Sequence, residues 1–116
     1  MDESRDGADS VAAGARTPEE LDTLFEDALL VRDGATLAAL FTDDAAFVAG
    51  DGPPARGGEA ITGLALALWG GGPSYVADPR RVVAARDFAL IVAERAISVV
   101  RRGCDGTWRY VIAVVS

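Results

Sequence analysis

The chain has 116 residues, a length that favours a single domain with one hydrophobic core. Its formal net charge of -7 argues against nucleic-acid binding, because a phosphate backbone requires clustered cations. One cysteine and no histidine exclude an internal disulfide and argue against a zinc or transition-metal site, so we expect no metal and no cofactor. No stretch is apolar enough to span a membrane and the N-terminus does not resemble a secretory signal, so we expect a cytoplasmic protein.

The N-terminal residues 1–16 are rich in Gly, Ala, Ser and Asp and show no apolar period, which predicts a flexible tail before one domain over 17–116. Thr17 is followed by Pro18 and then by Glu20. This order is typical of a helix start, with threonine as the cap, proline at the first helical position and glutamate closing a capping box. We therefore predict that regular structure begins at Thr17.

Helical spacing continues after this start and gives an apolar stripe that includes Phe25 and Leu29, with the acidic residues turned away from it. Gly34 is expected to end this helix in the left-handed conformation. A short second helix is predicted over 35–41, and a short strand over 45–49. The first two helices would then form a helical hairpin.

A loop rich in glycine and proline, at 50–54, follows the predicted strand and is expected to bend the chain sharply. Helical spacing returns over 59–69 and ends at a run of three glycines. Beyond that point the pattern predicts only strands. These are a short one near Tyr75 and longer ones over 81–86, 88–100 and 108–115.

The last two predicted strands are apolar on both faces, whereas an antiparallel sheet usually exposes one face to water. Two apolar faces require two covers, which would be the helices on one side and a second subunit on the other. Helices followed by a meander of strands predict an α+β fold with the helices on one face of a curved antiparallel sheet.

Four short segments in and between these predicted elements carry a family resemblance, and the resemblance as a whole covers nearly everything after Thr17. They are Arg-Asp-Gly at 32–34, Leu-Phe-Thr-Asp-Asp-Ala at 40–45, Gly-Glu-Ala-Ile at 58–61 and Asp-Gly-Thr-Trp-Arg at 105–109. In their order and spacing, the chain resembles the nuclear transport factor 2-like superfamily and, within it, the SnoaL-like and ketosteroid isomerase-like bacterial proteins.

This resemblance implies a cone-shaped, cystatin-like domain whose sheet wraps a helix-lined apolar cavity, and a homodimer formed through the outer face of the sheet. The expected partners are a small apolar molecule and a second copy of the chain, with no nucleic acid and no membrane. The residues expected to line the pocket are Phe25, Leu29, Phe47, Ala49, Trp69 and Tyr110.

The residues of ketosteroid isomerase catalysis are absent at the matching positions. Phe25 stands where the resemblance implies an oxyanion-hole tyrosine and cannot donate a hydrogen bond, and Ala49 stands where it implies the aspartate base. Asp51 lies two residues further on and would serve as a base only if the following loop folds back. Steroid-type isomerisation with the known residue set is therefore not expected.

Glu94 is the other candidate for acid-base chemistry, because it lies in the middle of the most apolar predicted strand. Burial there would raise its pKa toward neutrality. The alternative is a structural role, with Glu94 paired to Arg86 or Arg109 or exposed on the outer face.

Three functions remain open from the sequence. The first is noncatalytic binding of a small apolar molecule. The second is an enzyme of cyclase, isomerase or hydratase type, in which Glu94 or Asp51 acts as the base and Tyr110 orients a carbonyl group. The third is an assembly role, in which side chains fill the cavity and the apolar outer face of the sheet is the functional surface.

Overall fold

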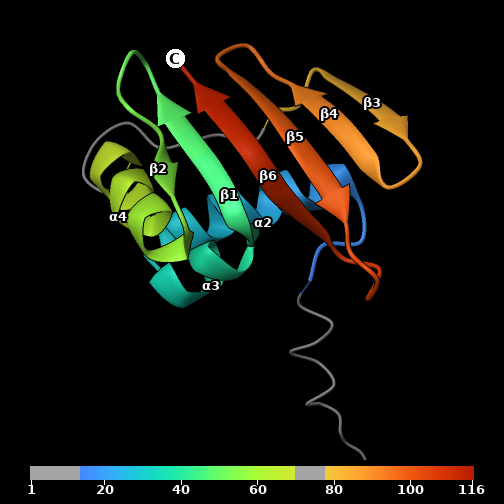
Figure 1. Cartoon of the computed structure of the whole chain (residues 1–116), viewed down its shortest axis with the longest axis horizontal. Coiled ribbons are helices and arrows are strands. Elements are labelled where there is room, and N and C mark those ends of the chain that lie inside the picture. Colours follow the sequence, from blue (N-terminus) through green and yellow to red (C-terminus); the bar gives the residue numbers. More distant parts are fainter. Residues whose placement is uncertain (1–13, 70–77) are drawn as a thin grey trace, which may run out of the picture.

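The computed structural model describes residues 14–69 and 78–116, and its helices precede all but two of its strands along the chain (Figure 1). The helices pack against one side of a curved six-stranded sheet, which confirms the predicted α+β class. The elements are α2 (Pro18–Leu30), α3 (Gly34–Ala39), β1 (Phe41–Ala49), β2 (Ala55–Arg56), α4 (Gly58–Trp69), β3 (Arg81–Ala85), β4 (Phe88–Val92), β5 (Ala96–Arg102) and β6 (Trp108–Val115).

The strands are arranged in the order β2-β1-β6-β5-β4-β3, so that the last strand in sequence lies inside the sheet between β1 and β5. Neighbouring strands are antiparallel except for β1 and β6, which run parallel. The sheet is therefore mixed rather than antiparallel throughout, because the chain passes through α4 and three further strands before β6 returns beside β1.

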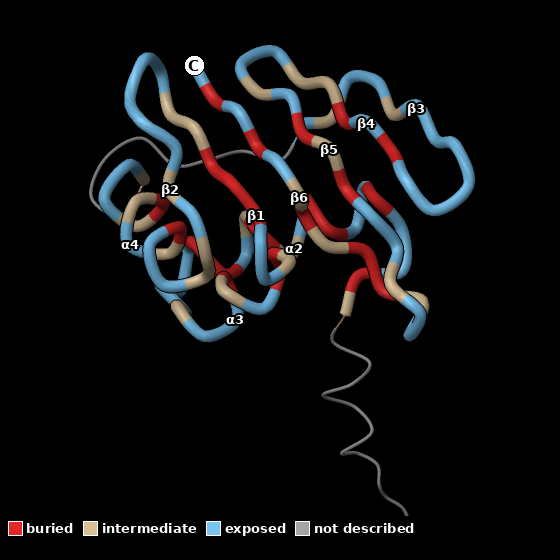
Figure 2. Tube along the Cα trace, viewed as in Figure 1, coloured by how far each residue is buried: buried red, intermediate tan, exposed pale blue. Residues whose placement is uncertain are grey.

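The register of the strands separates the sheet residues into an inner face, toward the helices, and an outer face. Ala113 is paired with both Phe47 and Ser98, and Ser98 is paired with Ile91, so these four residues form one row across the inner face. All four are buried, and α2 contacts the sheet at β4 and β6 (Figure 2). The core therefore lies between the helices and the inner face.

The strand predicted over 88–100 is two strands joined by a hairpin turn, and this expectation was wrong. β4 ends at Val92, residues 93–95 turn the chain, and β5 begins at Ala96. The amide of Ala93 donates to the carbonyl of Ala96, which closes the turn. Glu94 therefore lies in a turn and not in the middle of a strand.

The predicted start of the first helix is confirmed, but its predicted end is not. The amide of Glu20 donates to the hydroxyl oxygen of Thr17 at 3.0 Å, as expected for an N-cap. Arg32, with a φ of 53°, takes the left-handed conformation that Gly34 was expected to adopt. Gly34 instead begins α3, which Asp33 caps by accepting the amide of Thr36. Hydrogen bonds from Thr36 lower the pKa of Asp33.

Several boundaries also differ from the sequence prediction. β1 begins at Phe41 rather than at 45, and a short strand that was not predicted, β2, follows the loop at 50–54. Ala15, which the sequence placed in the tail, is buried and forms a bridge with Trp108. The strand predicted near Tyr75 lies outside the described residues.

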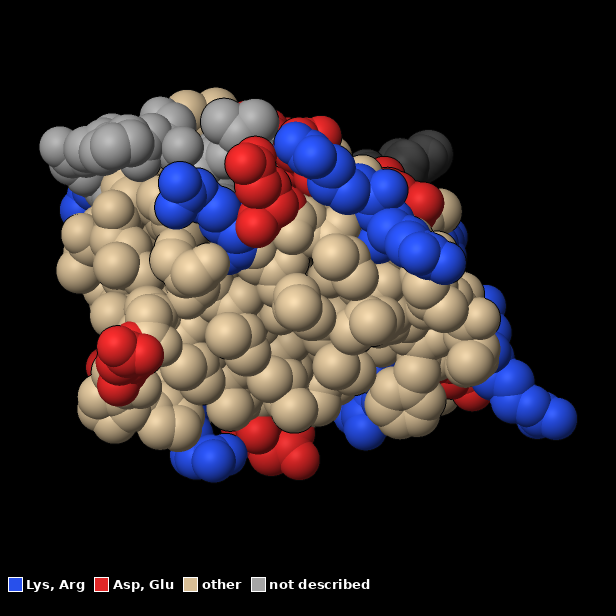
Figure 3. Space-filling view, turned by 90° about the horizontal axis from the view of Figure 1, so that it is seen from above, with Lys and Arg blue, Asp and Glu red and all other residues tan. Residues whose placement is uncertain are grey.

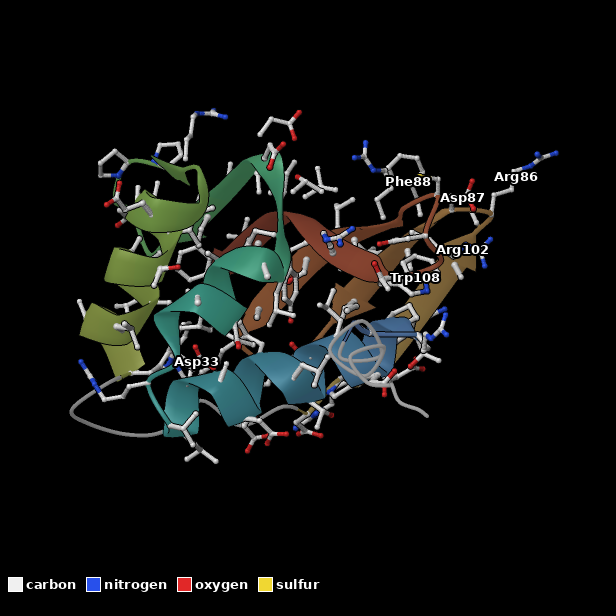
Figure 4. All side chains as sticks on the ribbon, turned by 90° about the horizontal axis from the view of Figure 1, so that it is seen from below. Asp33, Arg86, Asp87, Phe88, Arg102 and Trp108 are labelled. Atoms are coloured by element: carbon white, nitrogen blue, oxygen red, sulfur yellow. The ribbon has the colours of Figure 1, made fainter. Side chains whose placement is uncertain are left out.

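Polar contacts hold together the end of the sheet where the β3–β4 and β5–β6 turns lie (Figure 4). Arg102 forms an ion pair with Asp87 at 2.8 Å, and its guanidinium group lies 5.7 Å from the ring centre of Trp108. In the β5–β6 turn, Asp105 accepts the amide and the hydroxyl of Thr107 at 3.0 and 2.8 Å. These bonds lower the pKa of Asp105 from 3.8 to about 2.

Candidate functional site

A hydrogen bond between two buried polar side chains lies within the mostly apolar core. The hydroxyl of Tyr110 donates to Oδ1 of Asp22 at 2.6 Å, and each residue is only 3% exposed. Asp22 comes from α2 and Tyr110 from β6, so the bond joins the helical layer to the inner face of the sheet. We call these two residues the buried pair.

Two aromatic rings contact the tyrosine of the buried pair, and two further rings contact those. The ring of Phe25 lies 5.6 Å from that of Tyr110 and 5.8 Å from that of Trp69, both in edge-to-face geometry. Phe41 lies 5.0 Å from Tyr110, and Phe47 lies 6.0 Å from Trp69. These five residues, which we call the aromatic cluster, come from α2, β1, α4 and β6.

The local sequence explains why these side chains meet. Asp22, Phe25 and Leu29 are spaced three and four residues apart on α2, so they lie along one side of that helix. Phe41 and Phe47 are on β1, and their partners in the parallel pairing are Tyr110 and Ala113 of β6. Paired strand residues share a face of the sheet, so both phenylalanines point toward the helices with Tyr110.

The side chains that meet here are apolar except for the buried pair. Aromatic rings offer flat surfaces to an apolar molecule, while a carboxyl group accepts hydrogen bonds and a phenol both donates and accepts. Trp69 is half-buried at the end of α4, whereas the other four rings are buried. The aromatic cluster therefore approaches the surface at Trp69.

No family model matches the sequence, and no curated protein is significantly similar to it. Solved structures do match its fold. A ketosteroid isomerase-like protein from Erwinia carotovora atroseptica has a TM-score of 0.69 and 17% identity, covering 83% of this chain and 89% of its own. A nuclear transport factor 2-like protein with a cystatin-like fold from Novosphingobium aromaticivorans has a TM-score of 0.70 and 18% identity, covering 93% and 84%. The chain has the nuclear transport factor 2-like fold.

A third similar structure comes from Thiobacillus denitrificans and is described as a putative calcium/calmodulin-dependent protein kinase type II association domain. It has a TM-score of 0.69 and 19% identity, and the match covers 89% of this chain and 98% of that one. Identities this low establish the shared fold and no shared activity.

The six residues predicted to line the pocket lie together in this fold. Phe25, Leu29, Phe47 and Tyr110 are buried in one core cluster, and Ala49 and Trp69 are half-buried against it. Each belongs to the concave side of the fold, between the helices and the inner face of the sheet.

The two predicted catalytic carboxylates lie elsewhere. The side chain of Glu94 is 70% exposed and pairs at 3.3 Å with Arg80, rather than with Arg86 or Arg109. The prediction that Glu94 is buried was therefore wrong. Asp51 is exposed in the turn between β1 and β2. Neither residue belongs to the buried pair or to the aromatic cluster.

Asp22 is the residue that sequence reasoning missed. Its charge suggested the solvent side of α2, yet it lies three residues before Phe25 and seven before Leu29, both of which are buried. Helical spacing alone would have placed it on the buried side. A buried partner able to donate, here Tyr110, is what makes that position tolerable for a carboxyl group.

The outer face of the sheet is a second feature with functional potential. Six large apolar side chains on it are between 37% and 50% exposed. Uncharged side chains occupy the middle of this face, and acidic and basic side chains surround it (Figure 3). The six are Val83, Phe88, Leu90, Ile97, Ile112 and Val114.

Within residues 14–69 and 78–116, no group of three acidic or cysteine side chains is placed to hold a metal ion. None of the helices in those ranges has the length and hydrophobicity needed to cross a membrane.

Proposed function

We propose that this chain binds a small, mostly apolar molecule on the concave side of its sheet, with one polar group of the ligand hydrogen-bonded to the buried pair. The supporting observation is the Tyr110–Asp22 hydrogen bond surrounded by the aromatic cluster. Burying polar groups is costly unless they are satisfied, so an apolar core that serves packing alone has little need of a carboxyl group there.

The chemical class of the ligand follows from this site. Flat aromatic walls favour a planar or ring-containing molecule. Asp22 accepts hydrogen bonds, so a hydroxyl group on the ligand is the complementary group. The ligand reaches the aromatic cluster beside Trp69, the half-buried ring. An enzymatic role of cyclase, isomerase or hydratase type would then use Asp22 rather than Glu94 or Asp51 as the proton acceptor.

A pair of matched probes tests this proposal. We expect 2-naphthol to bind more tightly than naphthalene, which has the same ring system without the hydroxyl, by about fivefold for one added hydrogen bond. Trp69 fluorescence in a Trp108→Phe background reports binding, because the chain has only two tryptophans. Tyr110→Phe and Asp22→Asn should reduce the preference, and Ile97→Glu on the outer face should not. Equal binding of both probes, or none, would contradict the proposal.

The exposed outer face supports a second proposed role, which is association of two copies through this surface. Six exposed apolar side chains on one sheet face form a larger patch than isolated surface residues do. Sedimentation velocity should show a dimer at micromolar concentration, and Ile97→Glu, which places a charge in that face, should yield a monomer. A monomeric wild-type protein would remove this second role and leave the ligand proposal untouched.

A further inference from the structure

One buried hydroxyl group on the inner face of the sheet forms no hydrogen bond with the described part of the chain. It belongs to Ser98 on β5, which runs between β6 and β4 (Figure 1), and the residue is only 8% exposed. Asp22, Tyr110 and Thr107 are buried to a similar degree, and each of their side chains has a hydrogen-bond partner. Burying a hydroxyl group without a partner is unfavourable, so this exception requires an explanation.

Short side chains lie next to Ser98 on the inner face. Ala113 is its partner on β6, and Ala96 lies two residues before it on β5. Ala49 continues this group, because Ala49 and Ala96 are both paired with Val115. We call Ala49, Ala96 and Ala113 the alanine patch. A planar molecule can approach the strands more closely over this patch than over large side chains, and it then meets the serine hydroxyl.

The alanine patch is continuous with the aromatic cluster. Phe47, Ala113 and Ser98 follow one another across β1, β6 and β5 on the inner face. The ring of Phe47 lies 6.0 Å from that of Trp69, the half-buried ring at which the aromatic cluster approaches the surface. A ligand that enters beside Trp69 therefore reaches Ser98 over phenylalanine and alanine side chains.

Ser98 and the buried pair occupy different places on the concave side. Tyr110 is paired with Val100, which lies two residues after Ser98 on β5, so the two positions are about 7 Å apart along the strand. Asp22 belongs to the helical layer, whereas the serine hydroxyl lies close to the sheet itself. A ligand that contacts both therefore needs two polar groups with a ring system between them.

We propose that Ser98 is a second polar contact for the ligand and donates a hydrogen bond to a carbonyl oxygen, at the opposite end of the ring system from the hydroxyl group that binds Asp22. This inference rests on the proposed function and narrows its ligand class to ring-containing hydroxyketones. Asp22 selects the donor end of the ligand. Ser98 selects the acceptor end, because the alanines around it offer no side-chain donor.

Two probes that differ in one carbonyl group test this inference. 6-Acetyl-2-naphthol adds a ketone to 2-naphthol, and 6-isopropyl-2-naphthol has nearly the same shape without the carbonyl oxygen. Isothermal titration calorimetry gives the ratio of their affinities for each protein. Ser98→Ala should lower the ratio of acetyl to isopropyl binding by about fivefold relative to the wild type, as expected for the loss of one hydrogen bond. Ser116→Ala removes an exposed hydroxyl group at the C-terminus and should leave the ratio unchanged.

A second measurement separates ligand binding from a structural role of the serine. Without ligand, Ser98→Ala should unfold within about 3 °C of the wild type, because the protein itself does not use this hydroxyl group. A clearly larger decrease in Tm would overturn the inference, as would a ratio that Ser98→Ala leaves unchanged. If circular dichroism shows that Ser98→Ala does not fold, Ser98→Cys, whose thiol is a weak donor, replaces it.

The same titrations distinguish failure of this inference from failure of the proposed function. If 2-naphthol binds more tightly than naphthalene but neither substituted naphthol binds, the site does not extend to Ser98, and only this inference is overturned. If no naphthol binds, the proposed function is overturned together with it.

Discussion

Removing the hydroxyl of Tyr110 should destabilise the domain by a measurable and bounded amount. Tyr110→Phe keeps the ring, so its contacts with Phe25 and Phe41 persist, but Oδ1 of Asp22 loses the donor that lies 2.6 Å away. A buried polar group that loses its partner costs about 1–3 kcal/mol of unfolding free energy. For a domain of this size, 1 kcal/mol corresponds to about 4 °C in Tm, so we expect a decrease of roughly 4–12 °C.

Urea unfolding followed by circular dichroism measures the free energy, and a double-mutant cycle isolates the bond. Asp22→Leu combined with Tyr110→Phe removes both polar groups, so it should cost less than the sum of the single variants. Asp27→Asn changes an exposed carboxyl group of the same helix and should stay within about 0.5 kcal/mol of wild type. A Tyr110→Phe variant as stable as Asp27→Asn would refute the view that the buried pair matters energetically.

Three further predictions concern the helix cap, a turn and the outer face. Thr17→Ala should cost about 1 kcal/mol by urea unfolding, because the amide of Glu20 loses its acceptor, whereas Thr17→Ser should be close to neutral. The folded-state pKa of Asp105 is lowered to about 2, so its stabilising effect is present above about pH 4 and is lost as pH falls toward 2. The stability difference between wild type and Asp105→Asn should shrink over that window, and a constant difference would contradict this. Ile97→Glu should abolish concentration-dependent association in sedimentation while leaving the circular dichroism spectrum unchanged.

The sequence predicted the helices and the fold class better than it predicted the bounds and the pairing of the strands. Helix spacing and the cap at Thr17 are local features, and local features can be read along the chain. The parallel pairing of β1 with β6 joins residues more than sixty positions apart, about which periodicity carries no information. The turn at 93–95 was missed because Ala-Glu-Arg contains none of the usual turn residues and both flanking strands are apolar.

The candidate site was predicted in part for a related reason. Apolar residues such as Phe25 and Phe47 were expected inside and are inside, since their burial is favourable almost regardless of detail. A carboxyl group is different, because whether it is buried depends on whether another side chain is placed to hydrogen-bond with it. Asp22 is buried because Tyr110 of a distant strand meets it, and Glu94 is exposed because its surroundings are a turn and water.

The interior position of β6 has a consequence for how the domain forms. β6 (residues 108–115) joins β1 to β5. Without it the sheet separates into β2-β1 and β5-β4-β3, and neither part is wide enough to cover the helices. During synthesis, the apolar surfaces of the helices and of β1 to β5 therefore stay exposed until β6 has left the ribosome. Folding should accordingly be slow for the size of the chain and vulnerable to aggregation until β6 is in place.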